Sequence, residues 1–546
     1  MAAVTHVLDN ALARLDELTA PAQRIAVSAY GPSVFARPGA VRGVDLLVVC
    51  EGHTNGLRAH RRVIDGQEFR FLIADRSLLE SDVLNGTLGD FLTEQFLYPH
   101  HPILNLEYVN KVAMEAKTRV AQEEAHDLAL EYGEMVRGIV ATPEFFGLSR
   151  MRKLSRVFVP SMSAYLRLLE TSVRERNLAT LRASFREALA ESRVFGLEGD
   201  YVSLEDSAVD RWIKDRASEQ VVNIIRQSQR ALSAYLTKGR ALYLSPDLLA
   251  RELYTPLKFV LDSEIDRMDP ENPNTHLFLR TSEGLVPLNS QATLEQIIAD
   301  LKLGWPVTIS PLAGALNEVS LITAKDQQLV AKRFTDWHGF KWFTLNIVSL
   351  GTKLFAVSGK ARLTNEYGVN RYLAKKGIKV PHIVYVSVKQ RVLVERYVAG
   401  VSLADFAKQA VNQGGLAENQ KELAESLGQT LAAIHGTGVT VGDAKPENFV
   451  DKDGEIFTVD LEQAGKDGDK AWDIAELLFY AGHYNVLPVT IRGASEFTEA
   501  FTRGYLRDGD VSDLRKAGGI RYAKVFSIWT PAPILLEISR ILHDAK

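Results

Sequence analysis

The spacing of hydrophobic and polar positions changes several times along the chain. In the first hundred residues, apolar runs at 24–30, 44–50 and 69–73 follow an amphipathic segment that ends near Leu18. Short runs of this kind, separated by turn residues, are typical of strands. The front of the chain is therefore predicted to be a small α/β domain.

A different pattern extends from about residue 107 to residue 242. Apolar residues recur near helical spacing in 109–140 and 221–236, and turn signals are almost absent. This block is predicted to be an all-helical bundle. Breakers cluster at 269–275, and a hairpin is predicted at 276–288 around Ser282-Glu-Gly284.

Strand signals return after Leu316, at 319–323 and 328–334, followed by a helical stretch at 361–376 and further strands at 382–388 and 391–397. Helical patterns dominate after Leu403. A chain of 546 residues exceeds the roughly 250–300 residues of a single core. The expected fold class is α+β multidomain, with a first domain at 1–106, a helical domain at 107–244, a connector at 245–304 and a bilobal domain at 305–546.

Composition narrows the classes of protein. Apolar residues make up 46% and charged residues 24%, as in soluble globular proteins, and the net charge of -4 argues against a chain whose main task is coating nucleic acid. Cys50 is the single cysteine, which excludes an intramolecular disulfide and predicts a buried thiol. No run approaches the roughly 18 apolar residues that span a bilayer, so a cytoplasmic protein without a membrane partner is expected. The oligomeric state is not indicated.

The strongest local signal is the string Gly442-Asp-Ala-Lys-Pro-Glu-Asn448, followed by an apolar run and Asp460. Phosphoryl transfer needs a group that takes or orients the acceptor proton, and Asp443 suits that role. Lys445 would stabilise the developing negative charge. Asn448 and Asp460 offer the oxygen ligands that Mg²⁺ prefers. Taken singly, Asp443 could be a turn residue and Lys445 a solvated lysine.

Two residues upstream fit a nucleotide site. Lys332 lies in the middle of a predicted strand, a poor place for a charge unless a partner or nucleotide phosphates neutralise it. Glu366 in the following helical stretch could pair with Lys332. Gly314, in the turn before the first strand of this region, is a weak candidate for a loop whose amides bind phosphate.

In this order the motifs resemble the protein-kinase-like superfamily, over roughly residues 300 to 546. The segment 362–381, with Ile434-His435-Gly436 and Lys470-Ala-Trp-Asp473, looks most like the atypical KEOPS-complex and RIO kinases. The resemblance implies a kinase that uses ATP and Mg²⁺, with Lys332 on the α/β phosphates, Glu366 as its partner and Asp473 as a structural acid. It also implies an adenine hinge that includes Glu395, Tyr397 and Val398.

Some features depart from most protein kinases. Val441 stands where many have histidine, Asp460-Leu-Glu462 replaces Asp-Phe-Gly, and no Ala-Pro-Glu string follows. A serine/threonine protein kinase is the first expectation. A small-molecule kinase of the aminoglycoside-phosphotransferase type stays open, as does an RNA- or tRNA-associated regulatory ATPase in which this domain is a switch.

The front domain resembles the nucleotidyltransferase fold through Tyr30-Gly31-Pro-Ser33 and Gly43-Val-Asp45. Active members carry two acids separated by one residue, because two metals drive the attack on a nucleotide. Here the first acid position is Gly43, and only Glu68 or Asp75 are candidates for a third carboxylate. The resemblance therefore implies a degenerate relative used for binding or regulation.

Basic residues recur in the helical block, among them Arg150, Lys153, Arg156, Arg167, Arg211 and Lys214. They could form a basic surface for RNA, whose phosphates attract Lys and Arg. The alternative is a solvated helix face interleaved with Glu, which the pattern favours.

Overall fold

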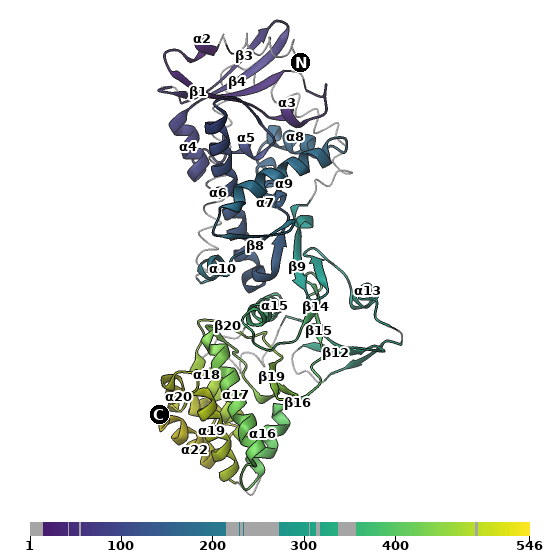
Figure 1. The fold of residues 1–546 in the computed structure, drawn as a ribbon, viewed down its shortest axis with the longest axis vertical. Coiled ribbons are helices and arrows are strands. Elements are labelled where there is room, and N and C mark those ends of the chain that lie inside the picture. Colours follow the sequence, from purple (N-terminus) through teal and green to yellow (C-terminus); the bar gives the residue numbers. More distant parts are fainter. Residues whose placement is uncertain are drawn as a thin grey trace. The chain divides into compact units, whose positions relative to one another are not determined.

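The computed structural model describes residues 12, 15–41, 43–53, 56–214, 226, 229, 233, 272–304, 306–312, 317–336, 356, 358–485 and 490–546. The chain forms two compact units, each built from two stretches of sequence. Unit 1 comprises Met1–Glu131 with Val140–Phe278, and unit 2 comprises Tyr132–Ile139 with Leu279–Lys546. The predicted mixed α and β content is found in both units (Figure 1).

A five-stranded mixed sheet forms the first part of unit 1, in the order β3-β4-β2-β1-β5. β2 is antiparallel to β1 and parallel to β4, and β3 and β5 close the edges in antiparallel pairing. The strands are β1 (Gln23–Tyr30), β2 (Val44–Glu51), β3 (Leu57–Ile64), β4 (Gln67–Asp75) and β5 (His101–Leu104). The three predicted strands are confirmed as β1, β2 and β4, whereas β3 and β5 were not predicted.

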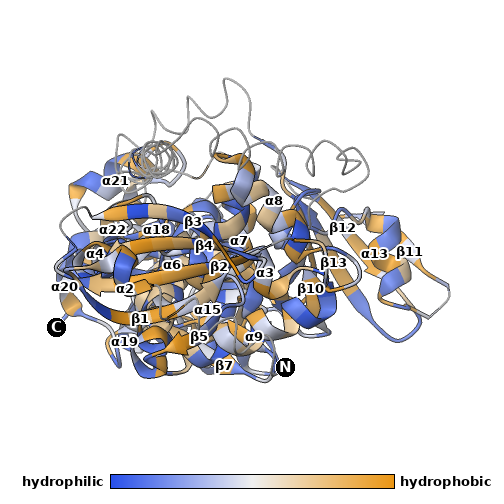
Figure 2. Cartoon of the chain, turned by 90° about the horizontal axis from the view of Figure 1, so that it is seen from above, coloured by the Kyte–Doolittle hydropathy of each residue, from blue (hydrophilic) through white to orange (hydrophobic). Residues whose placement is uncertain are grey.

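The apolar run of β2 is buried on both faces of this sheet. Leu47 and Val49 pack into one cluster with α4 (Arg76–Asn85) and α6 (Leu106–Tyr132), and Leu46 and Val48 pack into another on the opposite face. Side chains alternate across a strand, so a continuous apolar run is the pattern of a strand covered on both sides. Figure 2 shows β2 in orange along most of its length. Cys50 lies in the second cluster and burial raises the pKa of its thiol to about 11, as expected for a structural thiol.

The helical block of unit 1 also contains strands. β8 (Tyr201–Leu204) pairs with β6 (Ile139–Ala141) and β7 (Phe195–Glu198). The all-helical prediction is wrong here, because Gly199 and Asp200 form a two-residue hairpin turn, with Gly199 at a φ of 56°, in a block that the sequence pattern indicates to be almost free of turn signals. The helices are α7 (Glu144–Ser155), α8 (Val159–Leu168), α9 (Arg174–Ala190) and α10 (Asp206–Ile213), with the short α2 (Leu15–Thr19), α3 (Pro32–Phe35) and α5 (Glu94–Leu97) before α6.

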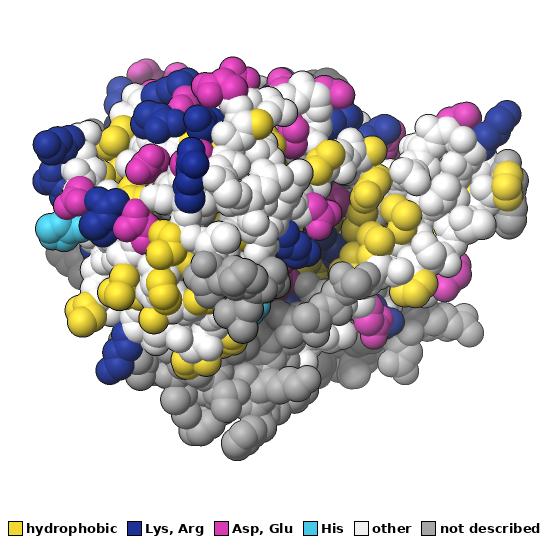
Figure 3. Space-filling model, turned by 90° about the horizontal axis from the view of Figure 1, so that it is seen from below, with side chains coloured by type: hydrophobic (Ala, Val, Ile, Leu, Met, Phe, Trp, Pro, Cys, Tyr) yellow, Lys and Arg dark blue, Asp and Glu magenta, His cyan; other side chains and the backbone are white. Residues whose placement is uncertain are grey.

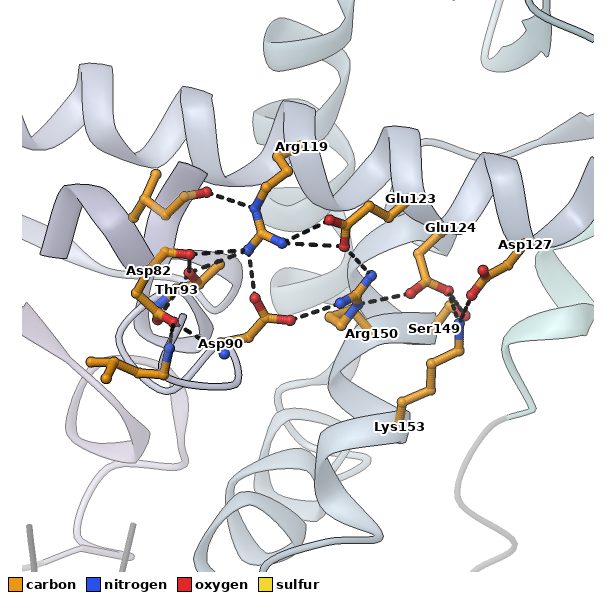
Figure 4. A network of polar contacts seen from close by, with 12 residues as sticks. Asp82, Asp90, Thr93, Arg119, Glu123, Glu124, Asp127, Ser149, Arg150 and Lys153 are labelled. Atoms are coloured by element: carbon orange, nitrogen blue, oxygen red, sulfur yellow. Dashed lines mark hydrogen bonds and ion pairs between the residues drawn. The ribbon is translucent and has the colours of Figure 1, made fainter. Parts of the chain in front are cut away.

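A buried ionic network connects α6 and α7 with the loop after α4 (Figure 4). Arg119 and Arg150 both pair with Asp90, at 2.5 and 2.7 Å. Arg150 continues to Glu123 and Glu124. Because Arg150 is buried among carboxylates, it does not belong to a basic surface, and the RNA hypothesis loses that residue.

Unit 2 contains a five-stranded antiparallel sheet in the order β11-β12-β13-β15-β14. Its strands are β11 (Thr308–Pro311), β12 (Glu318–Thr323), β13 (Gln328–Arg333), β14 (Ile383–Ser387) and β15 (Val392–Arg396). All but β11 were predicted, and so was the helix, α15 (Gly359–Lys375). The predicted hairpin is confirmed as β9 (Leu277–Thr281) and β10 (Gly284–Pro287), and a capping box at Thr293 starts α13 (Leu294–Asp300).

The rest of unit 2 is mainly helical and shares one large hydrophobic core, which includes Leu431, Trp472 and Phe501. Two short strand pairs carry the loops discussed below, β18 with β19 and β17 with β20. The elements are β16 (Val401–Ser402), α16 (Leu403–Asn412), α17 (Glu418–Gly436), β17 (Val439–Thr440), η3 (Pro446–Asn448), β18 (Phe449–Lys452), β19 (Glu455–Thr458), β20 (Gly465–Lys466), α18 (Lys470–His483), α19 (Arg492–Tyr505), α20 (Val511–Ala517), α21 (Ile520–Phe526) and α22 (Ala532–His543).

A segment from far upstream packs along α15. It is the 3₁₀ helix η1 (Gly133–Gly138), which belongs to unit 2 although its neighbours in sequence belong to unit 1. Tyr367 donates its hydroxyl to the carbonyls of Arg280 and Gly138, and Gly368 lies directly against the backbone of Glu134. The predicted helix over 109–140 therefore ends early, at Tyr132, where the chain turns into this contact.

Among the described residues, none of the helices is both long and apolar enough to cross a membrane.

Candidate functional site

The centre of the candidate site is Lys332 on β13. β13 lies between β12 and β15, so the side chain is 7% exposed. Its Nζ lies 2.9 Å from Oε1 of Glu366 and 3.1 Å from Oε1 of Glu395, and it donates to the carbonyl of Val459 at 2.8 Å. The expected pairing of Lys332 with Glu366 is present, and the lysine also reaches the residue directly before Asp460.

Glu366 joins two parts of the site. One carboxylate oxygen accepts from Lys332 and the other accepts from the backbone N–H of Leu461 at 2.7 Å. Helix α15 thereby fixes both the direction of Lys332 and the backbone that follows Asp460. A buried lysine and acid with these bonds satisfy each other's charge, which neither could do alone in this environment.

Negative groups outnumber positive ones around Lys332, because several carboxylates surround one ammonium group. Burial opposes the charge on Lys332, but Glu366, Glu395 and Asp460 outweigh it and raise the pKa of the lysine well above its usual value. Burial raises the pKa of Glu366 well above its usual value and raises that of Glu395, while Lys332 counteracts both shifts. The lysine therefore stays charged, and Glu366 and Glu395 hold protons more tightly than free carboxylates do, because burial raises the pKa of both.

Two acidic side chains of helix α18 bind the backbone of the loop that carries Asp443. Asp473 is fully buried and accepts from the backbone N–H groups of Val441 and Gly442, at 2.6 and 2.8 Å. Glu476, one turn further along the same face, accepts from the N–H of Ala444 at 2.9 Å. Asp473 thus has the position expected of a structural acid. Sequence reasoning missed Glu476, although its spacing of three from Asp473 on a helix could have indicated it.

Lys445 lies beside Asp443. Its Nζ is 2.7 Å from Oδ1 of Asp443 and 5.7 Å from the centre of the Tyr480 ring. Burial opposes the charge on Lys445, but Asp443 outweighs it and raises the pKa of this lysine. The side chains of the pair are partly exposed, 34% for Lys445 and 25% for Asp443.

Asn448 and Asp460 lie at the same end of the β18–β19 hairpin. Asn448 directly precedes the pairing of Phe449 with Thr458, and Asp460 follows it by two residues. The Asn448 carbonyl accepts from the N–H of Val459 at 2.9 Å, and its side-chain amide donates to the carbonyl of Asp443 at 2.7 Å. The hairpin therefore brings both expected metal ligands beside the Asp443 loop.

The donor set fits magnesium. Among the described residues, no group of three or more His, Cys, Asp or Glu could hold a metal ion. Mg²⁺ is commonly bound by one or two carboxylates together with substrate phosphates, so one carboxylate and one amide oxygen are sufficient on the protein side.

Of the expected hinge residues, Glu395 lies on β15, and Tyr397 and Val398 directly follow the end of that strand. Glu395 turns its carboxylate to Lys332, while Tyr397 donates its backbone N–H to the carbonyl of Gln328 at 3.0 Å and leaves its side chain 40% exposed. Val398 is half-buried. Gly314 lies outside the described residues.

Glu462 and its neighbours add contacts that were not predicted. Glu462 is buried and pairs with Arg362 of α15 at 3.1 Å and with Asn317 at 2.6 Å. Burial, together with nearby Asp460, raises the pKa of Glu462 to about 6, against the lowering effect of Arg362.

Comparison with known proteins supports a protein-kinase-like domain. No protein-family model matches the chain. It is 29% identical over 126 residues to the serine/threonine-protein kinase cds1 of Schizosaccharomyces pombe, covering 22% of this chain and 26% of that protein. It is 22% identical over 102 residues to the KEOPS complex subunit Bud32 of Pyrococcus abyssi, covering 19% of this chain and 44% of that protein. The chain thus spans less than half the length of either relative.

Solved structures also align with part of the chain. WaaP in complex with acyl carrier protein aligns with a TM-score of 0.26 at 18% identity, over 38% of this chain and 81% of that one. The microcompartment-associated aminopropanol kinase aligns with a TM-score of 0.25 at 12% identity, over 46% of this chain and 94% of that one. Scores this low do not carry an argument about activity or substrate.

Proposed function

We propose that unit 2 is a phosphotransferase that uses Mg-ATP. The observation that carries this proposal is the position of Lys332, which bonds to Glu366 and to the carbonyl directly before Asp460. A lysine and acid pair next to a metal-binding aspartate is the arrangement that kinases require before they can transfer a phosphoryl group. A buried lysine without a role in nucleotide binding would also need a partner acid, but it would not need to bond to the loop that carries a proposed metal ligand.

Each residue has a role in this proposal. Lys332 binds the α- and β-phosphates, and Asp443 receives the proton of the acceptor hydroxyl as its oxygen attacks the γ-phosphorus. The bond from the γ-phosphorus to the bridging oxygen breaks, and ADP leaves. Lys445 stabilises negative charge on the transferred group. Asn448 and Asp460 would hold Mg²⁺, which neutralises the phosphate oxygens when it is bound.

A serine or threonine hydroxyl of a protein is the first choice of acceptor. The Asp443-Ala-Lys-Pro-Glu-Asn448 string resembles the catalytic loop of serine/threonine kinases, and the 2.7 Å pair of Lys445 with Asp443 supports that comparison.

A small-molecule hydroxyl is the second candidate, and one observation favours it. Between Asp460 and the start of α18 at Lys470, the chain makes only the two-residue strand β20. This connection is too short to build an activation segment beside a peptide groove. An acceptor that needs no such groove fits the short connection better.

RNA as a partner has less support. The face in Figure 3 belongs to the end of Figure 1 that carries the C-terminal helices of unit 2, and its Lys and Arg side chains are interleaved with Asp and Glu. Lys153, like Arg150, is engaged by acids, pairing with Glu124 and Asp127. An ATPase switch acting on RNA would therefore have to rely on other residues of the helical block.

The front sheet is proposed to be a nucleotidyltransferase-like module without two-metal chemistry. Asp45 forms an ion pair with Arg70 at 2.7 Å, on the neighbouring strand β4. Gly43 has a φ of 92°, and a Cβ there would lie 3.1 Å from the carbonyl of Glu68, so an acid is not accommodated at the first position. One paired carboxylate does not hold two metals.

The test is transfer of the γ-phosphate from labelled ATP with Mg²⁺, comparing wild type with Asp443→Asn. Asp443→Asn is expected to bind ATP as wild type does and to lose transfer by about 10²- to 10⁴-fold, because only the proton acceptor is removed. Asp508→Asn, at an exposed aspartate of the same unit, is the matched control and should leave both quantities unchanged.

Label on protein, label on an added small molecule and free phosphate are measured in parallel. The first supports the protein kinase, the second the small-molecule kinase and the third an ATPase switch. Unchanged turnover in Asp443→Asn, or no ATP binding by wild type, would refute the proposed function.

A further inference from the structure

Three side chains from three separate segments form a closed triangle next to Asp460. Arg362 donates to Oδ1 of Asn317 at 2.6 Å and pairs with Glu462 at 3.1 Å, and Asn317 donates to Glu462 at 2.6 Å. Arg362 has 0% exposure and is among the largest fully buried side chains among the described residues. A charged group buried this deeply is tolerated only where its partners are well placed.

The three segments are the ones that surround a bound nucleotide in the proposed function. Asn317 ends the connection between β11 and β12, the hairpin that precedes Lys332 in the sheet. Arg362 lies on α15 one turn before Glu366, and Glu462 follows Asp460 by two residues. The triangle therefore links the residue directly before β12, the helix that orients Lys332 and the loop that carries a proposed metal ligand.

Helix α15 contacts the Asp460 loop along one face. Arg362 bonds to the Glu462 side chain, Asn365 donates to the Glu462 carbonyl at 3.2 Å, and Glu366 accepts from the N–H of Leu461 at 2.7 Å. Positions i, i+3 and i+4 lie on the same side of a helix, so all three contacts act together. The loop is thus held at two consecutive residues directly after Asp460.

We propose that Glu462, Arg362 and Asn317 are positioning residues that hold the Asp460 loop for magnesium and ATP. This inference rests on the proposed function. In the Asp-Phe-Gly string of most protein kinases, a glycine occupies the position that Glu462 has here. In this chain the buried ion pair of Glu462 with Arg362 holds the loop. None of the three side chains is required to touch the nucleotide, because Arg362 and Asn317 hold the side chain of Glu462, which itself belongs to the Asp460 loop.

The experiment measures ADP and ATP affinity by calorimetry in full-length protein, with EDTA and over a series of MgCl₂ concentrations. Glu462→Gln keeps the shape of the side chain and removes its charge. Changing a group that orients a metal ligand typically lowers the affinity for the metal by about 10- to 100-fold. The half-saturating Mg²⁺ concentration is therefore expected to rise by about tenfold or more, with nucleotide affinity in EDTA within about twofold.

Two further variants separate positioning from folding. Arg362→Met combined with Glu462→Gln should shift the Mg²⁺ dependence no further than the stronger single change, because residues that act as one unit are not additive. Asn317→Ala, at a half-buried position, should give a smaller shift in the same direction if Glu462→Gln fails to fold. Glu455→Gln, which breaks only the exposed pair with Lys379, is the matched control.

The outcomes are distinct from those of the transfer assay. Mg²⁺-dependent nucleotide binding that weakens in Glu462→Gln supports the inference even if wild type transfers no phosphate. A normal Mg²⁺ dependence in Glu462→Gln or, where that variant does not fold, in Asn317→Ala overturns it, whether or not melting temperature or turnover falls. Wild type that binds no nucleotide at any Mg²⁺ concentration overturns this inference together with the proposed function.

Discussion

Lys332 is the residue on which the charge balance of the site depends. It is the cation between Glu366 and Glu395, and both acids are buried. Removing one partner from a buried pair leaves an uncompensated charge, which is more costly than losing the attraction alone.

Lys332→Ala is expected to lower the free energy of unfolding by about 3–5 kcal/mol near pH 8, measured by urea unfolding. The loss should shrink toward pH 5. Without the lysine, the folded-state pKa values of Glu366 and Glu395 rise further, so the folded state binds more protons than the unfolded state. Stability of the variant then falls more steeply than that of wild type as pH rises through those pKa values.

Lys379→Ala is the control for Lys332→Ala, because its pair with Glu455 is about half-exposed and such pairs contribute about 0–1 kcal/mol. An equal loss of stability at pH 8 and pH 5 in Lys332→Ala would show that the buried acids are not its cause.

The sequence identifies the pair of Lys332 and Glu366 because a lysine inside an apolar strand requires a partner. It does not identify Glu462 or Asn317 in the same way. Their contact joins positions 145 residues apart, and each looks like an ordinary polar residue of a turn. Only the packing of α15 against the Asp460 loop makes them neighbours.

At the scale of elements, α15 is enclosed from two sides. One face contacts the Asp460 loop, and Tyr367 and Gly368 contact η1. The helix was predicted from its spacing, but the partner of this second face was not, because η1 lies in a stretch whose apolar spacing suggested a continuous helix. The position of Glu366 thus depends on residues more than 200 positions upstream.

Gly368→Ala is expected to push α15 away from η1, because the added methyl group would overlap the backbone of Glu134. Overpacking of this kind costs about 1–3 kcal/mol, and a displacement near 1 Å at the site can cost up to about 100-fold in rate. Thermal unfolding and phosphate transfer measure the two effects.

Gly436→Ala is the matched control for Gly368→Ala. Gly436 ends α17, and a Cβ there meets no atom within 4 Å. If Gly368→Ala transfers phosphate at the wild-type rate, the contact with η1 does not set the position of Glu366.

At the scale of the whole molecule, the chain passes between the two units three times. Unit 2 takes residues 132–139 from the middle of unit 1 and then everything from residue 279 onward. The boundaries predicted from the sequence pattern, with a kinase-like domain at 305–546, remain a prediction. Periodicity can mark where helices and strands change, but it cannot show that a short upstream segment packs elsewhere.

A fragment of residues 305–546 is expected to be less stable than the same unit in the full chain and to bind ATP weakly. It lacks both acceptors of the Tyr367 hydroxyl, which would leave a buried polar group without a partner. Solubility, cooperative melting and ATP affinity test this expectation.

A longer fragment that begins at residue 279 regains the carbonyl of Arg280 but not η1, and it should fall between the short fragment and the full chain. A fragment of 305–546 that melts as sharply and at the same temperature as unit 2 in the full chain would contradict the prediction.

The placement of η1 also constrains how the protein is made. Translation runs from the N-terminus at about 5–20 residues per second, so the ribosome finishes α15 on the order of tens of seconds after it releases Tyr132–Ile139. Unit 1 receives its last residues during that interval, while the partner of η1 is still being synthesised. Unit 1 can therefore fold while η1 still lacks its partner, and a chaperone that shields the waiting segment would raise the yield of folded protein.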